Sequence, residues 1–262
     1  MTIDTQVDLG LAGKVILVTG GVRGVGLGIA ATLSRLGAVV VACARNEGDG
    51  LAQLPRAEFA ACDVRDEDAV VAMMANIAQR HGQVDAVVNN AGGSPFALAT
   101  DASARFASKI IELNLVAPYI VARAAHQMMS QQPDGGVIVN VSSVSGHRPS
   151  PGTSAYGAAK AGLDNLTASL AVEWAPLVRV NSVVAGPVET EASALHYGDD
   201  DGIAAVGETI PMRRMAYPAD IGAAVAFLAS PLAAYITGST LTVHGGGERP
   251  AFLDAANAGN KI

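Results

Sequence analysis

A tyrosine and a lysine stand four residues apart in a run of helix-forming residues, Ala155-Tyr156-Gly157-Ala158-Ala159-Lys160. In a helix, this spacing places the phenol and the ammonium one turn apart on the same face. Because a neighbouring cation stabilises a phenolate, we expect Lys160 to lower the pKa of Tyr156 from its usual value near ~10. A tyrosine with such a pKa exchanges protons near neutral pH. The pair therefore predicts a general acid or base, with Ser143 a short distance upstream.

A glycine-rich loop near the N-terminus gives this pair a context. Residues 19–26 read TGGVRGVG, directly after an apolar run and at the start of a helical pattern. Glycines let the backbone turn tightly and approach a pyrophosphate, and a helix N-terminus offers free N–H groups and the positive end of a dipole. The loop lacks the GxxxxGK(S/T) pattern, which disfavours an NTP-hydrolysing phosphate loop. We therefore predict a dinucleotide site that includes Gly20, Gly24, Val25 and Gly26.

Two arginines indicate which dinucleotide this site takes. The second apolar run ends in Cys43-Ala44-Arg45-Asn46, where an acidic residue would bind the ribose hydroxyls of NAD. An arginine at that position pairs with a 2′-phosphate, and Arg23 lies within the glycine loop itself. We therefore expect NADP(H) to be the preferred cofactor, with NAD(H) as the alternative. Either arginine taken alone is also explained as a solvated surface residue.

Strand-like and helix-like segments alternate along the chain. Such alternation is typical of a parallel sheet with right-handed crossovers. The predicted strands are 14–19, 38–44, 58–62, 84–89, 136–141, 178–184 and 239–243, and the predicted helices are 24–36, 66–81, 101–130, 154–174 and 218–229. We expect a single α/β domain over residues 1–262, a doubly wound, Rossmann-type parallel sheet of about seven strands with helices on both faces.

Three segments fall outside this alternation. Residues 1–13 are expected to form an N-terminal arm, and residues 248–262 a C-terminal tail. Residues 189–216 carry the acidic run Asp199-Asp200-Asp201 and show little periodicity, so we expect a loop with short helices that lies over the site and binds substrate. A solvated surface insertion explains the acidic run equally well.

The composition disfavours several other classes of function. The formal charge of -7 at pH 7 disfavours a nucleic-acid partner, because such a partner requires a basic surface. Cys43 and Cys62 are too few for a disulfide framework, and the 5 histidines lack metal-site spacing, so we expect no metal and a reducing, cytoplasmic location. The uncharged stretch 221–243 contains Pro231 and Gly238, which favours a buried helix, a turn and a strand over contact with a membrane.

With these motifs in this order, the chain resembles the short-chain dehydrogenase/reductase family over roughly residues 10–247. The resemblance rests on the glycine loop 19–26, Asn89-Asn90-Ala91-Gly92 after the fourth predicted strand, Asn114, Ser143 and Tyr156-xxx-Lys160. Further cofactor contacts implied by the resemblance are Asp63 and Val64 beside the adenine, Asn90, Ala91 and Gly92 along the cleft, and Val188 and Thr190 at the carboxamide.

The resemblance also implies a role for each of four residues. Tyr156 would be the general acid in ketone reduction and the general base in alcohol oxidation. Lys160 would bind the nicotinamide ribose and lower the pKa of Tyr156. Ser143 would donate a hydrogen bond to the substrate oxygen, where charge develops as hydride moves. Asn114 would hold a water molecule that links Lys160 to solvent.

The activity implied is that of an NADP(H)-dependent oxidoreductase that interconverts a secondary alcohol and a ketone by hydride transfer. Its partners would be a small carbonyl or alcohol substrate and further copies of the chain, in a homotetramer that pairs helices 101–130 and 154–174. Two other interpretations stay open: a cofactor-binding regulator or scaffold without turnover, and an epimerase or dehydratase that uses the same tyrosine and lysine. The substrate is not specified by the fold and depends on residues 94–99 and 189–216.

Overall fold

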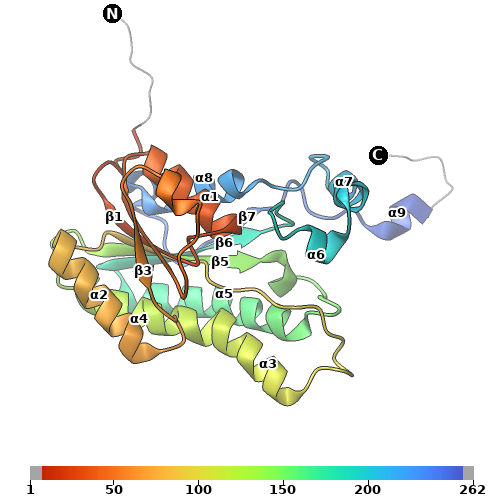
Figure 1. Ribbon diagram of the computed structural model, residues 1–262, viewed down its shortest axis with the longest axis horizontal. Coiled ribbons are helices and arrows are strands. Elements are labelled where there is room, and N and C mark those ends of the chain that lie inside the picture. Colours follow the sequence, from red (N-terminus) through yellow and green to blue (C-terminus); the bar gives the residue numbers. More distant parts are fainter. Residues whose placement is uncertain (1–7, 256–262) are drawn as a thin grey trace, which may run out of the picture.

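The computed structural model of the chain describes residues 8–255, so residues 1–7 of the expected N-terminal arm and 256–262 of the expected tail lie outside the described part. The described part contains a seven-stranded parallel sheet. Its strands are β1 Val15–Thr19, β2 Val39–Ala44, β3 Ala57–Ala61, β4 Ala86–Asn89, β5 Gly136–Ser143, β6 Val178–Ala185 and β7 Thr240–Val243. They lie in the order β3-β2-β1-β4-β5-β6-β7, with helices on both faces (Figure 1). The predicted Rossmann-type α/β fold is confirmed.

The helices also follow the predicted order. The longer ones are α1 Gly24–Arg35, α2 Glu67–His81, α3 Ala104–Ile111, α4 Ala117–Met129, α5 Ser154–Trp174, α7 Asp200–Thr209 and α8 Pro218–Ala229. The short ones are η1 Leu51–Gln53, η2 Glu112–Val116, η3 Val144–Gly146, α6 Ala194–Tyr197, η4 Pro231–Ala233 and α9 Ala251–Ala255. Each predicted strand and helix is present, with ends shifted by a few residues at most.

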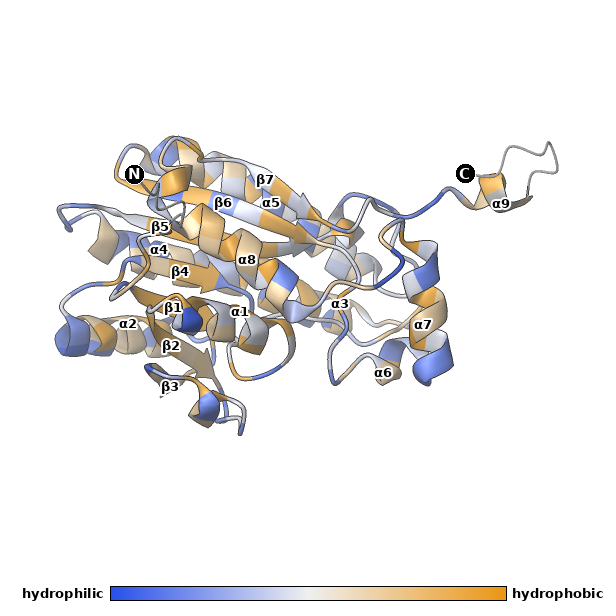
Figure 2. Cartoon of the chain, turned by 90° about the horizontal axis from the view of Figure 1, so that it is seen from above, coloured by the Kyte–Doolittle hydropathy of each residue, from blue (hydrophilic) through white to orange (hydrophobic). Residues whose placement is uncertain are grey.

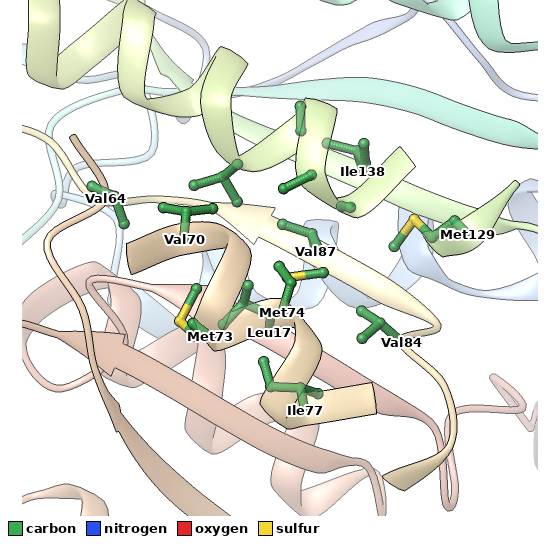
Figure 3. Close-up of a cluster of buried hydrophobic side chains, with 14 of the residues drawn as sticks. Leu17, Val64, Val70, Met73, Met74, Ile77, Val84, Val87, Met129 and Ile138 are labelled. Carbon is green, nitrogen blue, oxygen red and sulfur yellow. The ribbon is translucent and has the colours of Figure 1, made fainter. Parts of the chain in front are cut away.

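Alternate residues of each central strand face two separate layers of helices. In β1, Leu17 packs in the cluster that includes α2, α4 and α5, whereas Ile16 and Val18 pack in the cluster that includes α1 and α8. Figure 3 shows the first cluster, in which Leu17 and Val87 of the sheet meet side chains of α2. In Figure 2, much of the strands and of α8 beside them has the orange colour of hydrophobic residues. This two-sided burial explains why the strands read as continuous apolar runs.

Helices α1 and α8 approach each other closely because a glycine lies between them. A Cβ atom on Gly28 would lie only 2.1 Å from Cβ of Pro218, the first residue of α8. Any residue with a Cβ at this position would displace one of the two helices. The contact holds the start of α8, and with it the end of segment 189–216, beside α1.

The predicted helix 101–130 contains a π-helical turn. Residues 104–129 are helical throughout, as α3, η2 and α4, but η2 has the wider π spacing. A π turn accommodates an extra residue within a helix and commonly occurs at functional sites. Asn114 lies in this turn and is 0% exposed.

The carboxyl ends of the strands meet at one edge of the sheet. The glycine loop follows β1, residues 90–92 follow β4, and Ser143 is the last residue of β5. Segment 189–216 leaves the sheet after β6, and its two ends meet in a parallel bridge between Val188 and Ala216. Its helices α6 and α7 lie beyond this edge of the sheet (Figure 1). The candidate site residues are therefore gathered at the strand ends, under the segment.

The uncharged stretch 221–243 lies in α8, η4 and β7, an arrangement that its proline and glycine predict. Among residues 8–255, no helix combines the length and the apolar character that crossing a bilayer requires.

Candidate active site

Tyr156 and Lys160 lie one turn apart on α5. Lys160 Nζ is 5.5 Å from the centroid of the Tyr156 ring and donates a hydrogen bond of 2.7 Å to the carbonyl oxygen of Val141 in β5. Lys160 is only 3% exposed. This burial lowers its pKa to about 8, while the carboxylate of Asp164 acts in the opposite direction. Lys160 therefore changes its charge near physiological pH.

The pKa of Tyr156 differs from the sequence-based expectation. Burial raises it above its usual value, the hydrogen bond with the Ser143 hydroxyl lowers it, and the nearby Tyr197 raises it. The expected lowering of this pKa by Lys160 is not found: the pKa is raised, and the groups that act on it are the burial, Ser143 and Tyr197. The ammonium of Lys160 donates to Val141 and lies 5.5 Å from the centroid of the ring. Tyr156 is consequently protonated at neutral pH, which is the form that a general acid requires.

Ser143 lies where β5 passes into the turn η3. Its Oγ accepts a hydrogen bond of 3.2 Å from the N–H of Ser145, and the residue is half-buried. The turn lies directly on α5 because a Cβ on Gly146 would be 2.7 Å from the backbone nitrogen of Ala161. This close contact fixes the serine relative to the helix that carries Tyr156, and the structure brings the predicted serine and tyrosine together.

Asn114 uses its side-chain amide within the protein. Nδ2 donates to the carbonyl oxygens of Ile110 and Gly93, and Oδ1 accepts from the N–H of Gly93, each at 2.9 Å. A Cβ on Gly92 would lie 2.5 Å from Oδ1 of Asn114 and 3.6 Å from Nζ of Lys160. The asparagine thus holds residues 92–93 beside the lysine. Its role in holding a water molecule for Lys160 stays a prediction.

Asp164, one turn beyond Lys160 on α5, connects the elements around the site. Its carboxylate accepts from the hydroxyls of Ser182 at 2.7 Å and Ser142 at 2.9 Å, which belong to β6 and β5. His147, which follows η3, places Nε2 2.9 Å from the same carboxylate. Sequence reasoning missed this cluster. The available signal was the helical spacing of Asp164 from Lys160.

The glycine loop forms a cradle that side chains would fill. A Cβ on Gly26 would lie 2.1 Å from the carbonyl oxygen of Gly20, which itself has a φ of 64°. Asn90 donates its amide N–H to the carbonyl groups at the start of the loop. At the start of α1, the N–H of Gly24 binds a carboxylate oxygen of Glu191 at 3.0 Å. A carboxylate there stands in for a phosphate oxygen, so the loop fits the pyrophosphate of a dinucleotide.

The loop after β4 lies directly against this cradle. The Thr19 hydroxyl accepts from the N–H groups of Asn90 at 2.9 Å and Ala91 at 3.0 Å. A Cβ on Gly20 would lie 3.0 Å from Cα of Ala91. Residues 90–92 therefore connect the glycine loop to Lys160, along the cleft where they were predicted to contact the cofactor. That contact stays a prediction.

The arginines predicted at the 2′-phosphate are exposed and unpaired. Within residues 8–255, neither the Arg23 nor the Arg45 guanidinium forms a hydrogen bond or an ion pair. Their loops lie side by side, because a Cβ on Gly48 would be 2.7 Å from the carbonyl oxygen of Val22. Two guanidinium groups are thus available to an anion at this end of the cleft.

Asp63 and Val64, predicted beside the adenine, follow β3. Val64 is 7% exposed and belongs to the apolar cluster of Figure 3. Asp63 accepts from Arg65 Nε at 2.9 Å and Nη2 at 2.6 Å. This pairing lowers the pKa of Asp63 to about 2, with a smaller contribution from the charge of Arg45. Sequence reasoning missed Arg65, which compensates the one carboxylate predicted at this end.

Thr190 lies over the glycine loop at the start of segment 189–216. A Cβ on Gly24 would be 3.7 Å from Cγ2 of Thr190. The N–H of Thr190 donates to Oγ of Ser193 at 2.8 Å, which closes a tight turn. Val188, just before the segment, packs against the apolar cluster beneath α1 and α8. Both residues border the cleft, and their predicted contact with a carboxamide stays a prediction.

A cavity of about 120 Å³ opens beside the start of α5. Residues from two parts of the chain line it: Ser94, Ala97, Ala99, Ala102, Ser103, Ala104, Phe106, Ala107, Gly152, Thr153, Ser154 and Ala155. The cavity thus includes part of segment 94–99 and reaches Ala155, the residue before Tyr156. Among the described residues, no group of three or more His, Cys, Asp or Glu side chains is placed to hold a metal ion.

Comparisons with known proteins agree with this geometry. A family model described as Enoyl-(Acyl carrier protein) reductase matches residues 20–248. The chain is 39% identical over 245 residues to 3-oxoacyl-(acyl-carrier-protein) reductase FabG of Vibrio harveyi, covering 91% of this chain and 98% of that protein. It is 36% identical over 246 residues to L-fucose dehydrogenase of Oryctolagus cuniculus, covering 90% and 86%. Ligand-free aldohexose dehydrogenase of Thermoplasma acidophilum superposes with a TM-score of 0.86 at 31% identity, covering 98% and 100%.

The chain belongs to the short-chain dehydrogenase/reductase family. It is accordingly an oxidoreductase that acts on CH–OH or carbonyl groups with NAD(P). The names of these relatives refer to different substrates, an acyl chain on a carrier protein, L-fucose and aldohexoses.

The buried ammonium predicts a pH dependence of stability. Between pH 8, near the pKa of Lys160 in the folded chain, and 10.5, its usual value, the unfolded chain binds more protons than the folded chain. The free energy of unfolding therefore rises with pH across this window, by on the order of 3 kcal/mol in total. We expect Lys160→Met to remove this rise, as measured by urea unfolding at several pH values. Lys109→Met, at an exposed position of α3, is the control that keeps it. If the free energy of unfolding changed with pH in the same way in wild type and Lys160→Met, the lowered pKa of Lys160 would be contradicted.

Proposed function

We propose that the chain is an NADP(H)-dependent oxidoreductase that interconverts a secondary alcohol and a ketone, with Tyr156 as general acid and base. The observation that supports this most directly is a protonated tyrosine, Tyr156, in hydrogen-bond contact with Ser143, one turn from a buried lysine and beside a cradle that fits a dinucleotide. When bound, the dinucleotide supplies or accepts the hydride.

The residues of the chain handle the substrate oxygen and its proton. Ser143 donates a hydrogen bond to the carbonyl oxygen, and Tyr156 delivers the proton that the developing alkoxide requires. Lys160, whose pKa is about 8, carries a positive charge at neutral pH one turn from the tyrosine, where it would bind the nicotinamide ribose. In the reductive direction the tyrosine acts as the acid, and in the oxidative direction it acts as the base.

The preference for NADP(H) is supported by the charges at the adenine end of the cleft. Arg23 and Arg45 are exposed and form no ion pair within residues 8–255, which leaves both guanidinium groups available to a 2′-phosphate. The nearby carboxylate of Asp63 forms its ion pair with Arg65 and not with these two arginines. NAD(H), which lacks the 2′-phosphate, gains nothing from these charges.

Exchange of one of these charges tests the cofactor preference. We expect Arg45→Asp to weaken NADPH binding roughly tenfold or more, because a charge-assisted bond to the phosphate is replaced by repulsion. NADH binding should stay unchanged or improve. Fluorescence titration with both cofactors measures this, and Arg35→Asp, at the far end of α1, is the matched control. An equal effect on both cofactors would show that Arg45 does not contact the 2′-phosphate.

Removal of one hydroxyl tests the proposed catalysis. A substrate panel of 3-oxoacyl thioesters, aldoses and secondary alcohols follows from the names of the relatives. We expect Tyr156→Phe to lower turnover of any accepted substrate at least ~100-fold, because the proton donor is lost. NADPH affinity should be unaffected, and Tyr235→Phe, at a fully exposed tyrosine, should behave as wild type.

Two results would contradict the proposal in different ways. Retained turnover in Tyr156→Phe would remove the catalytic role of the tyrosine alone. A wild-type chain that binds NADPH tightly but turns over no member of the panel would favour a regulator or scaffold.

A cytoplasmic location is part of the same proposal. Cys43 and Cys62 are both free and buried. Their mutual hydrogen bond, together with burial, raises the pKa of the Cys43 thiol well above its usual value. A thiol of raised pKa is a poor nucleophile, so Cys43 is suited to a structural role in a reducing compartment.

A homotetramer is the proposed assembly. Two large side chains on adjacent helices are exposed in the single chain, Tyr119 of α4 at 41% and Val172 of α5 at 82%. Exposed apolar side chains on neighbouring helices favour packing against another copy.

Light scattering measures this assembly. We expect a mass four times that of the 26.5 kDa chain. Val172→Asp should reduce the measured mass, because the change places a charge in the proposed apolar contact between copies of the chain. Val71→Asp, at an exposed valine of α2, should leave the mass unchanged. A monomeric wild-type chain at micromolar concentration would exclude the tetramer.

A further inference from the structure

Glu191 reaches from segment 189–216 to the start of α1. Its carboxylate accepts the N–H of Gly24 at 3.0 Å, and a Cβ on Gly24 would lie 3.8 Å from the same oxygen. The two residues are 167 positions apart in the chain. The contact therefore connects the segment expected to bind substrate with the loop expected to bind cofactor.

Helix α1 has little other negative charge at its N-terminus. No acidic residue lies in its first turn, and its N-cap residue, Arg23, makes no capping bond through its side chain. The first N–H groups of a helix lack partners within the helix and attract an anion. By comparison, the N-cap residues of α2 and α7 are Asp66 and Asp199, and the side chain of each caps its own helix. In α1 the anion is the carboxylate of Glu191, which comes from a distant segment of the chain. It takes the place that a bound phosphate would occupy.

We propose that Glu191 sets the affinity of the chain for its dinucleotide, because its carboxylate and the cofactor pyrophosphate compete for the N–H groups at the start of α1. Cofactor binding then releases the first turn of segment 189–216 from the glycine loop. This inference rests on the proposed function, since it requires that a dinucleotide binds in the cradle.

The competition follows from charge and space. A carboxylate and a pyrophosphate repel each other and cannot accept the same N–H. The turn that carries Glu191 is held by the hydrogen bond from the N–H of Thr190 to Oγ of Ser193. Ser193 is only 3% exposed. Because the segment is closed by the Val188–Ala216 bridge, a displaced Glu191 moves within this loop rather than pulling on the sheet.

Calorimetric titration of NADPH tests the competition. We expect Glu191→Gln to bind NADPH roughly three- to tenfold more tightly than wild type, because the repelling charge is gone. Glu191→Ala should bind at least as tightly as the glutamine variant. The matched control is Glu189→Gln, which removes the same charge two positions away from an exposed side chain without a contact to the glycine loop in the described part. Its affinity should stay within about twofold of wild type.

Hydrogen exchange gives a second readout that needs no cofactor. In the free chain, the amide of Gly24 should exchange faster in Glu191→Ala than in wild type, because it loses its acceptor. Thermal unfolding checks that the variants remain folded.

Different outcomes overturn different claims. Equal or weaker NADPH binding by Glu191→Gln, or unchanged exchange at Gly24 in Glu191→Ala, would overturn the role of Glu191 and leave the proposed function intact. If wild type bound neither NADPH nor NADH, the proposed function and this inference would both fail.

Discussion

The buried ammonium of Lys160 is the interaction on which the site depends. A charged group removed from water is costly unless it is hydrogen-bonded and compensated. Here the carbonyl oxygen of Val141 accepts from the ammonium, and the carboxylate of Asp164 lies one turn further along the same helix. Both partners come from elements that also position the proposed catalytic groups, β5 with Ser143 and α5 with Tyr156. Satisfying one buried charge therefore aligns the strand and the helix that carry these groups.

Three glycines allow backbone segments around the site to approach each other closely. Gly146 lets the turn after Ser143 lie on α5, Gly92 lets the loop after β4 meet Asn114 beside Lys160, and Gly26 lets α1 start against the glycine loop. At each of the three positions, a Cβ would lie between 2.1 and 2.7 Å from a neighbouring atom. The site is thus compact because its backbone segments approach each other directly at these glycines.

The sequence was sufficient to predict the fold and the placement of Tyr156 near Lys160 and Ser143. Strands buried on both faces read as apolar runs, so β1 and β5 were evident, and the spacing of Tyr156 and Lys160 placed them on one face of a helix. Their electrostatics were not predictable, because the pKa of Tyr156 depends on its burial and on where the lysine nitrogen points. Asp164 was missed although its helical spacing from Lys160 was visible, because its serine partners lie on two strands. Glu191 was missed because its partner, Gly24, is 167 positions away in the chain, and no local pattern connects the two.

The bridge between Val188 and Ala216 has a consequence for the history of such chains. Because the two ends of the intervening segment pair with each other, its length and composition can change while the sheet and the buried lysine stay as they are. Relatives named for acyl, fucose and aldohexose substrates are 31–39% identical to this chain. A closed, self-contained insertion of this kind can be replaced as a module during evolution, without rebuilding the sheet beneath it.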